Sequence, residues 1–410
     1  MVNVVEREQV GEKLPKGWKW VKLGDVGSFD SGGTPSKDNA NYWGGEVPFV
    51  TGADITNFHI KKEDARAFLT DVGLNSGKTS ICNPGTVLFV TRTRVGRVGI
   101  AKEVMGASQD LSPYTCGKDI LPEYVCRYLL SITNHLSENC RGSTIKGLVR
   151  DFVHTLKIPL PPLPEQKRIV DILTDRLSTI DKARTATEAQ LEAAKALPAA
   201  YLREVFDSPE AQKWEKKRLG DIAETCSGST PSRERKDYYI GEIPWIKTGE
   251  LRDGIIYHSE EHISTLALRE TSVKLLPAKT LLVAMYGQGQ TRGRTGLLAQ
   301  LATTNQACFA ILPNDEEFEP KYLQFWFQNS YSRLREETEG RGGNQPNLNG
   351  ELLRDQIVVL PPLDAQLSIV SNLERVNEKT QTIVKSLQSQ LDTINKLPAA
   401  LLRQAFNGEL

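Results

Sequence analysis

Two stretches of the chain carry seam residues at the alternating three- and four-residue spacing of a coiled coil. In the first stretch these positions hold Val170, Leu173, Leu177, Ile180, Arg184, Thr187, Leu191 and Ala194. In the second stretch they hold Val370, Leu373, Asn377, Thr380, Val384, Leu387, Leu391 and Ile394. A narrow apolar stripe with charged flanks predicts two long helices that pair with each other, and the alternative is a pair of amphipathic core helices.

The polar residues within the two stripes predict the direction of pairing. Arg184 and Thr187 occupy the fifth and sixth seam positions, whereas Asn377 and Thr380 occupy the third and fourth. Parallel helices would set all four polar side chains against apolar partners. Antiparallel pairing about a common centre brings Arg184 to Thr380 and Thr187 to Asn377. We expect the antiparallel arrangement, because buried polar groups need partners.

Upstream of each stripe, short apolar runs alternate with Gly and Pro turns, which is typical of strands in a compact domain. The runs expected to form strands are 47–50, 86–90, 243–246 and 280–284. Segments 122–132 and 320–330 each begin with a proline and are predicted helices. Each long helix follows a proline cluster, with Pro164 suited to the first helical position and Asp364 to the N-cap.

The whole pattern occurs twice along the chain. Adding 196 to Trp18, Leu23, Gly24, Asp25, Gly32, Thr34, Pro35, Ser36, Tyr42, Gly45, Glu46 and Pro48 gives the same residue types in the second copy. Adding 200 does the same for Pro161, Pro162, Leu163, Gln166, Ile169, Val170 and Leu173, and again for Leu197, Pro198, Ala199, Ala200, Leu202, Arg203 and Phe206. So many identities in one register indicate a tandem duplication.

The duplication and the helix pattern together predict the architecture. We expect an α/β protein of two similar mixed α/β globular domains, separated by two long helices that form an antiparallel coiled coil with a pseudo-twofold axis. The predicted boundaries are a first globular domain over 1–157, a first helical spacer over 158–212, a second globular domain over 213–357 and a second spacer over 358–410. A helix from Pro164 to Ala196 would be about 50 Å long.

Composition and charge change this picture only slightly. The 410 residues suit two domains rather than one core. The six cysteines form no C-x-x-C pair, so buried structural cysteines are expected rather than a zinc site. The N-terminus lacks the apolar segment of a signal peptide, and no apolar run is long enough to span a bilayer, so we expect a cytoplasmic protein with no membrane partner.

The net charge is zero, but its distribution indicates a positive surface in each copy. Residues 72–102 contain no Asp or Glu and hold Lys78, Arg92, Arg94, Arg97 and Lys102. The aligned window 271–314 is also free of acids and holds Lys274, Lys279, Arg292 and Arg294. Short acid-free windows also arise by chance, yet local potential rather than net charge steers a polyanion.

The sequence contains near misses to catalytic motifs and no convincing active site. Residues 73–79 are one position short of a P-loop and are not followed by a helix pattern, and residues 287–293 miss the dinucleotide fingerprint. His258 and His262 have the spacing of a metal pair, but no Glu follows His258 and the first copy has no counterpart. We expect no catalytic residue and no metal site.

Two groups of loops in each copy carry residues able to read DNA bases, since Arg pairs with guanine, Gln or Asn with adenine, and Thr or Ser with either edge. The DNA-binding residues expected in the first copy are Thr34, Ser36, Arg92, Thr93, Arg94, Arg97, Ser143, Thr144 and Lys146. Those expected in the second copy are Thr230, Ser232, Tyr286, Gln288, Gln290, Arg292, Arg294, Arg341, Asn344, Gln345 and Asn347. The alternative is that these are solvated loops without a ligand.

These features resemble the specificity subunit of type I restriction and modification systems. The resemblance rests on Leu-Gly-Asp at 23–25 and 219–221, Ile-Pro-Trp-Ile at 243–246, Asn-Gln-Ala at 305–307, residues 343–348, and the Leu-Pro-Pro-Leu helix starts at 160 and 360. It covers nearly the whole chain. The first copy departs from it at 142–148, where the Gln-Pro-Asn of the second copy is missing.

The resemblance implies two target recognition domains that each read half of an asymmetric double-stranded DNA site, with the helices as a ruler. It also implies two adenine methyltransferase subunits that bind S-adenosylmethionine and restriction subunits that use ATP and Mg. The chain itself would be a subunit without catalysis or cofactor. The alternatives are a bivalent protein-interaction scaffold without DNA binding and, disfavoured by the missing motifs, a nuclease or free-standing methyltransferase.

Overall fold

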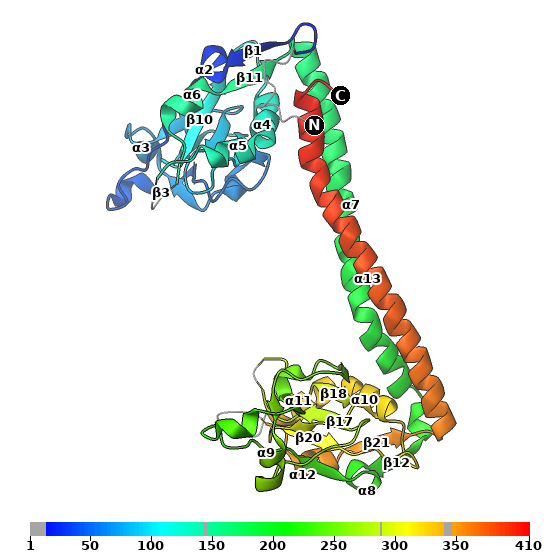
Figure 1. Cartoon of the computed structure of the whole chain (residues 1–410). Coiled ribbons are helices and arrows are strands. Elements are labelled where there is room, and N and C mark those ends of the chain that lie inside the picture. Colours follow the sequence, from blue (N-terminus) through cyan, green and yellow to red (C-terminus); the bar gives the residue numbers. More distant parts are fainter. Residues whose placement is uncertain (1–13, 143–145, 288, 340–346) are drawn as a thin grey trace. The chain divides into compact units, whose positions relative to one another are not determined.

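The structure is a computed structural model that describes residues 14–142, 146–287, 289–339 and 347–410. The chain divides into two compact units, Met1–Glu188 with Ser389–Leu410 and Ala189–Gln388. Each unit therefore contains one globular part and one section of each long helix (Figure 1). No described helix is both long and apolar enough to cross a membrane.

The globular part of the first unit is built on a five-stranded sheet. Its order is β2 (Gly27–Phe29), β10 (Leu111–Cys116), β7 (Val87–Val90), β8 (Val98–Ala101) and β4 (His59–Ile60), and only β4 and β8 pair in parallel. A second sheet has the order β5 (Ala67–Leu69), β3 (Trp43–Val50), β9 (Met105–Ala107) and β6 (Ser80–Cys82). Strands β1 (Lys19–Lys22) and β11 (Lys157–Leu160) form an antiparallel ribbon before the first long helix.

The globular part of the second unit repeats this plan. Its five-stranded sheet has the order β13 (Thr225–Ser227), β20 (Cys308–Ile311), β17 (Leu281–Ala284), β18 (Thr295–Leu298) and β15 (Gly254–Ile256). A three-stranded sheet has the order β16 (His262–Ile263), β14 (Ile243–Ile246) and β19 (Thr303–Thr304), and β12 (Glu215–Arg218) pairs with β21 (Ile357–Leu360). The strands and the mixed α/β class expected from the repeat are confirmed.

Both central strands are apolar throughout because both faces of the sheet are covered. Val87 and Phe89 of β7 enter the core that includes helix α4 (Pro122–Ser131), whereas Leu88 and Val90 enter a second core on the opposite face. In β17 the residues 281 and 283 enter one core and 282 and 284 enter another. The uninterrupted apolar runs in the sequence are explained by this double burial.

Short helices flank the sheets. In the first unit they are α2 (Leu23–Val26), α3 (Asp71–Leu74), α4 (Pro122–Ser131), α5 (Thr133–Glu138) and α6 (Arg150–Thr155). In the second unit they are α8 (Leu219–Ile222), α9 (Thr265–Glu270), α10 (Pro320–Asn329), α11 (Tyr331–Glu339) and α12 (Gly350–Arg354). Helices α4 and α10 begin at the prolines that predicted them, where the missing N–H costs nothing.

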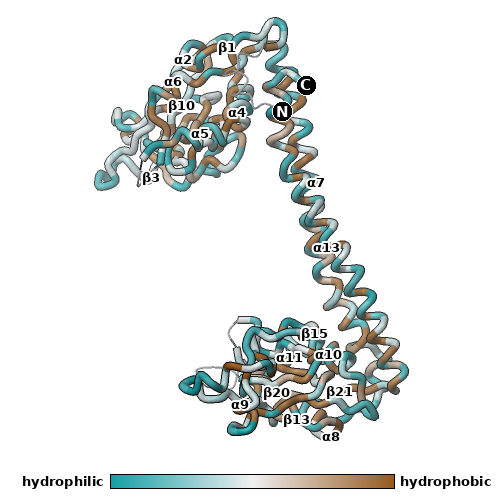
Figure 2. Tube along the Cα trace, viewed as in Figure 1, coloured by the Kyte–Doolittle hydropathy of each residue, from teal (hydrophilic) through white to brown (hydrophobic). Residues whose placement is uncertain are grey.

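The two long helices are α7 (Leu163–Phe206) and α13 (Leu363–Phe406), and they run antiparallel within each unit. In the first unit, Ile169 and Leu173 near the start of α7 share a core with Leu402 and Phe406 at the end of α13. In the second unit, the end of α7 packs with the start of α13. In Figure 2 both helices alternate between hydrophobic and hydrophilic positions along their length. The antiparallel direction predicted from the polar breaks is confirmed.

The register of the two helices differs from the predicted one. Arg184 lines a pocket of the first unit together with Ile394 and Asn395, and Ile394 lies fourteen residues, or about 21 Å along α13, from Thr380. The expected contact of Arg184 with Thr380 is therefore corrected. The prediction assumed that polar seam residues need partners across the seam. Instead, Arg184 is exposed and contacts Asp181 of its own helix.

The polar residues Thr187, Thr380 and Asn377 occupy the seam without the predicted layer. Thr187 is buried, and its hydroxyl donates to the carbonyl oxygen of Ala183 at 2.8 Å, one turn earlier in α7. A threonine can satisfy its hydroxyl within its own helix in this way. Thr380 is also buried and Asn377 half-buried. The expected contact of Thr187 with Asn377 belongs to the same register as that of Arg184 with Thr380, so it is corrected as well.

The helices are also longer than predicted. Each has 44 residues, or about 66 Å, because the helix continues through Pro198 in α7 and Pro398 in α13. Proline removes one hydrogen bond to the preceding turn but leaves the rest of the helix in place. Both helices begin at a leucine, so Pro164, expected at the first helical position, and Asp364, expected at the N-cap, both stand at the second helical position. At that position the charge of Asp364 still favours the helix N-terminus.

A buried glutamine joins the start of each long helix to the globular part of the same unit. The Gln166 side chain accepts from the Leu121 N–H at 2.9 Å and donates to the Asp119 and Pro161 carbonyl oxygens, both at 2.9 Å. Gln366 accepts from the Glu319 N–H at 2.9 Å and donates to the carbonyl oxygens of Glu317 and Pro361. Both side chains are almost fully buried. We call these two contacts the glutamine joints.

The end of the other long helix completes each joint. Phe406 packs its ring against Tyr124 and Tyr128 of α4, with centroids 5.2 Å apart in both cases. Phe206 packs against Tyr322 of α10 at 5.4 Å. The hydroxyls of Tyr124 and Tyr322 in turn donate to the matched carbonyl oxygens of Pro159 and Val359. One globular part therefore holds both long helices in each unit.

Replacing Gln166 by Ala should weaken the joint of the first unit. The substitution leaves the Leu121 N–H and two carbonyl oxygens unpaired, at about 1–3 kcal/mol for each buried group. We expect faster hydrogen exchange at the Leu121 amide and a lower melting temperature. Gln190→Ala, at an exposed position of α7, is the control and should change stability by about 0.5 kcal/mol or less. Unchanged protection of the Leu121 amide would contradict the proposed role of the joint.

Candidate nucleic-acid interface

Three loops of the first unit meet beyond the end of strand β7. The Thr91 N–H donates to the Asp110 carbonyl oxygen at 2.9 Å, and the Leu148 N–H donates to the Thr91 carbonyl oxygen at 2.8 Å. The Thr93 N–H donates to the Lys146 carbonyl oxygen at 3.2 Å. These backbone bonds place the loop at 92–97 between the turn at 108–110 and the segment at 146–148.

The second unit repeats this network at matched positions. The Met285 N–H donates to the Ala307 carbonyl oxygen at 2.9 Å, and the Leu348 N–H donates to the Met285 carbonyl oxygen at 3.1 Å. The segment after the central strand therefore lies beside residues 146–148 in the first unit and beside Leu348 in the second. Because the bonds involve only the backbone, the arrangement is independent of which side chains the loops carry.

A fourth segment reaches each network through a threonine and a glutamine. The Thr34 hydroxyl donates to Gln109, and the Thr230 hydroxyl donates to Gln306 in the second unit. Neither glutamine was among the predicted residues, although both copies place a glutamine in the same turn. We name the segments 34–36, 92–97, 108–110 and 146–148 the first loop surface. The second loop surface comprises 230–232, 286–287, 289–294, 305–307 and 347–348.

The first loop surface carries cations that no acidic side chain of the described residues neutralises. Arg92, Arg94, Arg97 and Lys146 are exposed, and none of them has an acidic partner among the described residues. Thr93 has a φ of 64°, a conformation that L-residues rarely adopt, which turns the loop tightly between Arg92 and Arg94. Exposed, unpaired guanidinium groups on a fixed loop are suited to phosphates or to guanine edges.

The second loop surface offers different side chains. Arg292 is only 4% exposed, and Arg294 forms an ion pair with Asp253. Asp253 also accepts from the Thr295 N–H at 2.8 Å and from its hydroxyl at 2.9 Å. Both arginines are thus engaged with the fold, unlike the predicted free readers. Among the described residues of this loop, Tyr286 and Gln290 are exposed and carry polar side chains.

Helix α11 supports the second loop in a way that the sequence pattern did not reveal. The Tyr331 hydroxyl donates to the Gln290 carbonyl oxygen at 2.8 Å. Arg335 donates to the carbonyl oxygens of Arg292 and Gly289 at 3.1 and 3.0 Å. These residues hold backbone rather than bind a ligand. Their counterparts in the first copy are of other residue types, so the repeat gave no signal for them.

The remaining predicted residues fall into two groups. Ser36, Ser232 and Asn347 are exposed on the two loop surfaces. Six expected DNA-binding residues lie outside the described part of the chain, namely Ser143, Thr144, Gln288, Arg341, Asn344 and Gln345.

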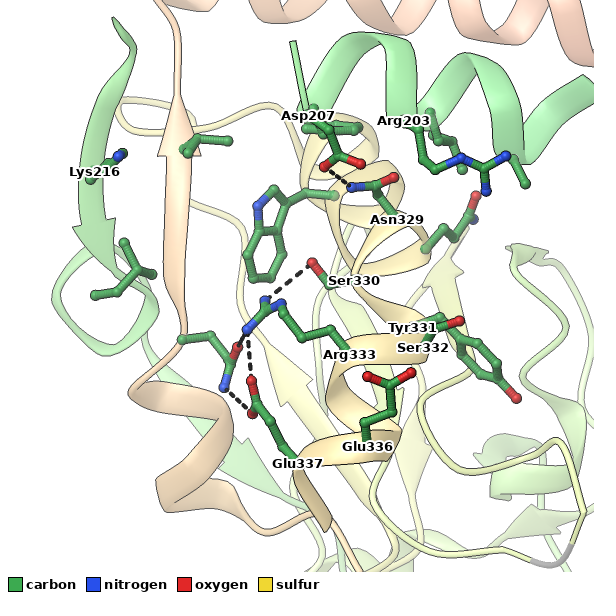
Figure 3. Close-up of a pocket in the computed structure, with 18 of the residues that line it drawn as sticks. Arg203, Asp207, Lys216, Asn329, Ser330, Tyr331, Ser332, Arg333, Glu336 and Glu337 are labelled. Atoms are coloured by element: carbon green, nitrogen blue, oxygen red, sulfur yellow. Dashed lines mark hydrogen bonds and ion pairs between the residues drawn. The ribbon is translucent and has the colours of Figure 1, made fainter. Parts of the chain in front are cut away.

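A separate pocket of about 960 Å³ lies in the second unit between the end of α7, helix α11 and strands β12 and β21 (Figure 3). Its charged residues carry both signs and partly bind one another. Asn329 donates to Asp207 at 3.1 Å, and Arg333 contacts Glu337 at 2.8 Å and Gln356 at 3.0 Å. With mixed charge, this pocket is less suited to a polyanion than the first loop surface.

The near misses to catalytic motifs have structural roles in the described residues. Helix α3 ends at Leu74, and strand β6 rather than a helix follows Lys78, so residues 73–79 do not form a phosphate-binding loop. No group of three or more His, Cys, Asp or Glu side chains in the described part could hold a metal ion. Burial raises the pKa of the Cys82 and Cys116 thiols to about 12, which keeps both protonated near neutral pH.

Comparison with known proteins identifies the family. The model of the type I restriction modification DNA specificity domain matches residues 15–193 and again 211–393, once in each copy of the repeat. The chain belongs to the type I restriction modification DNA specificity family. The resemblance seen in the sequence is thereby confirmed.

Two relatives in this family match along almost the whole chain. The MjaIX specificity subunit of Methanocaldococcus jannaschii is 25% identical, with 97% of this chain and 94% of the relative covered. The EcoKI specificity subunit of Escherichia coli is 25% identical, with 97% and 90% covered. Both are named as specificity subunits of type I restriction enzymes.

Solved structures share the fold of this family member. The HsdS subunit from Thermoanaerobacter tengcongensis has a TM-score of 0.66 at 20% identity, with 97% of this chain and 98% of that chain covered. A chain from a study of assembly and conformational transition of the type I restriction-modification system has a TM-score of 0.75 at 20% identity and covers 97% of this chain. The two-copy fold with long helices is therefore shared along the full length.

Proposed function

We propose that the chain is the DNA-recognition subunit of a type I restriction-modification complex and that each globular part reads one half of an asymmetric, bipartite site. The observation that carries this proposal is the repeated loop network. Matched backbone bonds hold both loop surfaces, while the exposed side chains differ between the units. A duplicated scaffold with unlike reading residues fits a ligand whose two halves differ in sequence.

The proposal assigns residues 1–157 and 213–357 to the two target recognition domains and residues 158–212 and 358–410 to the helical spacers. In the first domain, Arg92, Arg94 and Thr93 are the proposed base readers, with Lys146 and Ser36 at the rim. In the second domain, Tyr286 and Gln290 take that role, because Arg292 is buried and Arg294 is paired with Asp253. The polar residues of 143–144, 288, 341 and 344–347 complete the proposed set.

In this proposal, partner proteins catalyse the methylation and the cleavage of DNA. The chain recognises double-stranded DNA, two adenine methyltransferase subunits bring S-adenosylmethionine, and restriction subunits bring ATP and Mg. The chain is then non-catalytic and acts in the cytoplasm, where its DNA lies. The net charge of zero fits this division, since partners can provide many of the phosphate contacts that dominate affinity.

Arg94→Ala should relax recognition of one half-site only. If Arg94 pairs with a base, the loss is about 1–3 kcal/mol at that base, whereas the second half-site keeps its preference. Selection from a random duplex library by the chain bound to its methyltransferase partner measures both halves at once. Gln290→Ala is the matched variant and should relax the other half. A uniform loss of affinity over all sequences would make Arg94 a phosphate contact instead.

Deleting one heptad from each long helix should shorten the gap between the half-sites. Seven residues correspond to about 10.5 Å of helix, or about three base pairs at 3.4 Å per base pair. Deleting a whole heptad from both helices preserves the phase of the apolar seam. The same selection from a random duplex library measures the length of the gap between the half-sites. If the selected gap stays the same, the helices do not act as a ruler.

A further inference from the structure

The first unit contains a small cationic pocket beside its loop surface. The pocket has a volume of about 380 Å³ and is lined by Arg97 and Arg127 together with Thr56, Asn57 and Phe58. No carboxylate is among its described lining residues. Arg97 is the last residue of the loop at 92–97, and its guanidinium approaches the Ile55 carbonyl oxygen at 3.5 Å.

Arg127 is an unusual residue for its position. It lies on α4 among buried apolar neighbours, and its guanidinium carbon stands 4.0 Å from the ring centroid of Phe58. Its Nε is buried without a hydrogen-bond partner. Partial burial lowers the pKa of this group. The half-buried Arg127 forms no ion pair with a described residue, including Glu123 one turn earlier.

The surrounding charges leave the two arginines unneutralised. The Asp64 carboxylate is bound by the Asn57 amide at 2.7 Å and by the Lys61 N–H at 2.9 Å. His59 is under the electrostatic influence of Lys102, Glu123 and Arg127. Arg127 lines a second pocket of about 820 Å³ as well, where the Asp181 carboxylate is paired with Arg184. Among the described residues, no carboxylate forms an ion pair with Arg97 or Arg127.

The second unit gives a direct comparison at matched positions. The Val90 N–H donates to the Arg97 carbonyl oxygen at 2.9 Å, and the Ala284 N–H donates to that of Arg294 at 2.9 Å, so the two arginines correspond. The positions of Asn57 and Arg127 are then held by Asp253 and Phe325. Arg97 and Arg127 contribute two positive charges, whereas Arg294 and Asp253 cancel.

We propose that the pocket of Arg97 and Arg127 binds a phosphate group of the DNA backbone next to the first half-site. This inference rests on the proposed function. Guanidinium groups bind phosphate through paired, charge-assisted hydrogen bonds, and the pocket borders the loop that carries the proposed base readers. The first recognition domain thus gains a backbone anchor that the second domain lacks, because Asp253 and Phe325 occupy the matched place.

The test compares the full chain with Arg127→Phe, which copies the residue of the second unit. Arg127→Lys retains the charge, and Arg176→Gln removes an exposed charge from α7 as a control. Inorganic phosphate, at ionic strength matched with chloride, should raise the melting temperature of the wild type and of Arg127→Lys but not of Arg127→Phe. Equal stabilisation of wild type and Arg127→Phe by phosphate would overturn the proposal that this pocket binds phosphate.

A second experiment measures binding to duplex DNA and tests whether the bound phosphate belongs to the DNA backbone. The slope of log K against log salt should fall by about 0.9 in Arg127→Phe and stay unchanged in Arg176→Gln, with the selected bases the same. Phosphate binding with an unchanged DNA slope would mean that the pocket takes a free anion, which overturns the backbone contact. If phosphate binds but no duplex does, the proposed function fails separately while the anion site stands.

Discussion

The attachment of each globular part to two long helices is the constraint on which the rest of the structure depends. In each unit a buried glutamine amide satisfies three backbone groups at the start of one helix, and a phenylalanine at the end of the other helix packs on a tyrosine of the same domain. Removing one partner from such a buried set leaves the others unpaired, so the geometry is closely specified. Each globular part is therefore attached to both long helices within its own unit.

The same separation of scaffold and variable part recurs at the loops. Backbone hydrogen bonds position both loop surfaces, and the Thr–Gln contacts at 34 and 109 and at 230 and 306 repeat in both units. The side chains of the loops can therefore differ between the two units while the loops keep their positions. Arg97 is exposed and has no acidic partner among the described residues, whereas its counterpart Arg294 is paired with Asp253. Difference at matched positions is what an asymmetric site demands.

Much of the fold was predictable because the same sequence pattern occurs twice along the chain. The central strands were visible as apolar runs, and the antiparallel direction followed from the displaced polar seam residues. The register was wrong because Thr187 satisfies its hydroxyl on Ala183 and Arg184 turns to Asp181, so neither needs a partner across the seam. Helix length was underestimated because a proline at 198 removes one hydrogen bond without ending a helix that buries Leu202 and Phe206 beyond it.

The candidate site was less predictable, for a physical reason. Residue type indicates which groups can bind a base, but only packing decides which are exposed. Arg292 and Arg94 look alike in sequence, yet one is 4% exposed and the other lies on the surface. Gln109, Arg127 and Arg335 act through neighbours distant in the chain, so local patterns could not single them out. Asn57 and Asp253 could be recognised as matched positions only after the structure had shown that Arg97 corresponds to Arg294.

The central claim is that two unlike loop surfaces on one repeated scaffold read two unlike half-sites. Sequencing of methylated adenines in a cell that expresses this chain with an adenine methyltransferase partner tests it most directly. We predict one bipartite motif with two different halves and a fixed gap, and no such motif when the partner is expressed alone. Methylation at a continuous site, or a motif that is unchanged without this chain, would contradict the account.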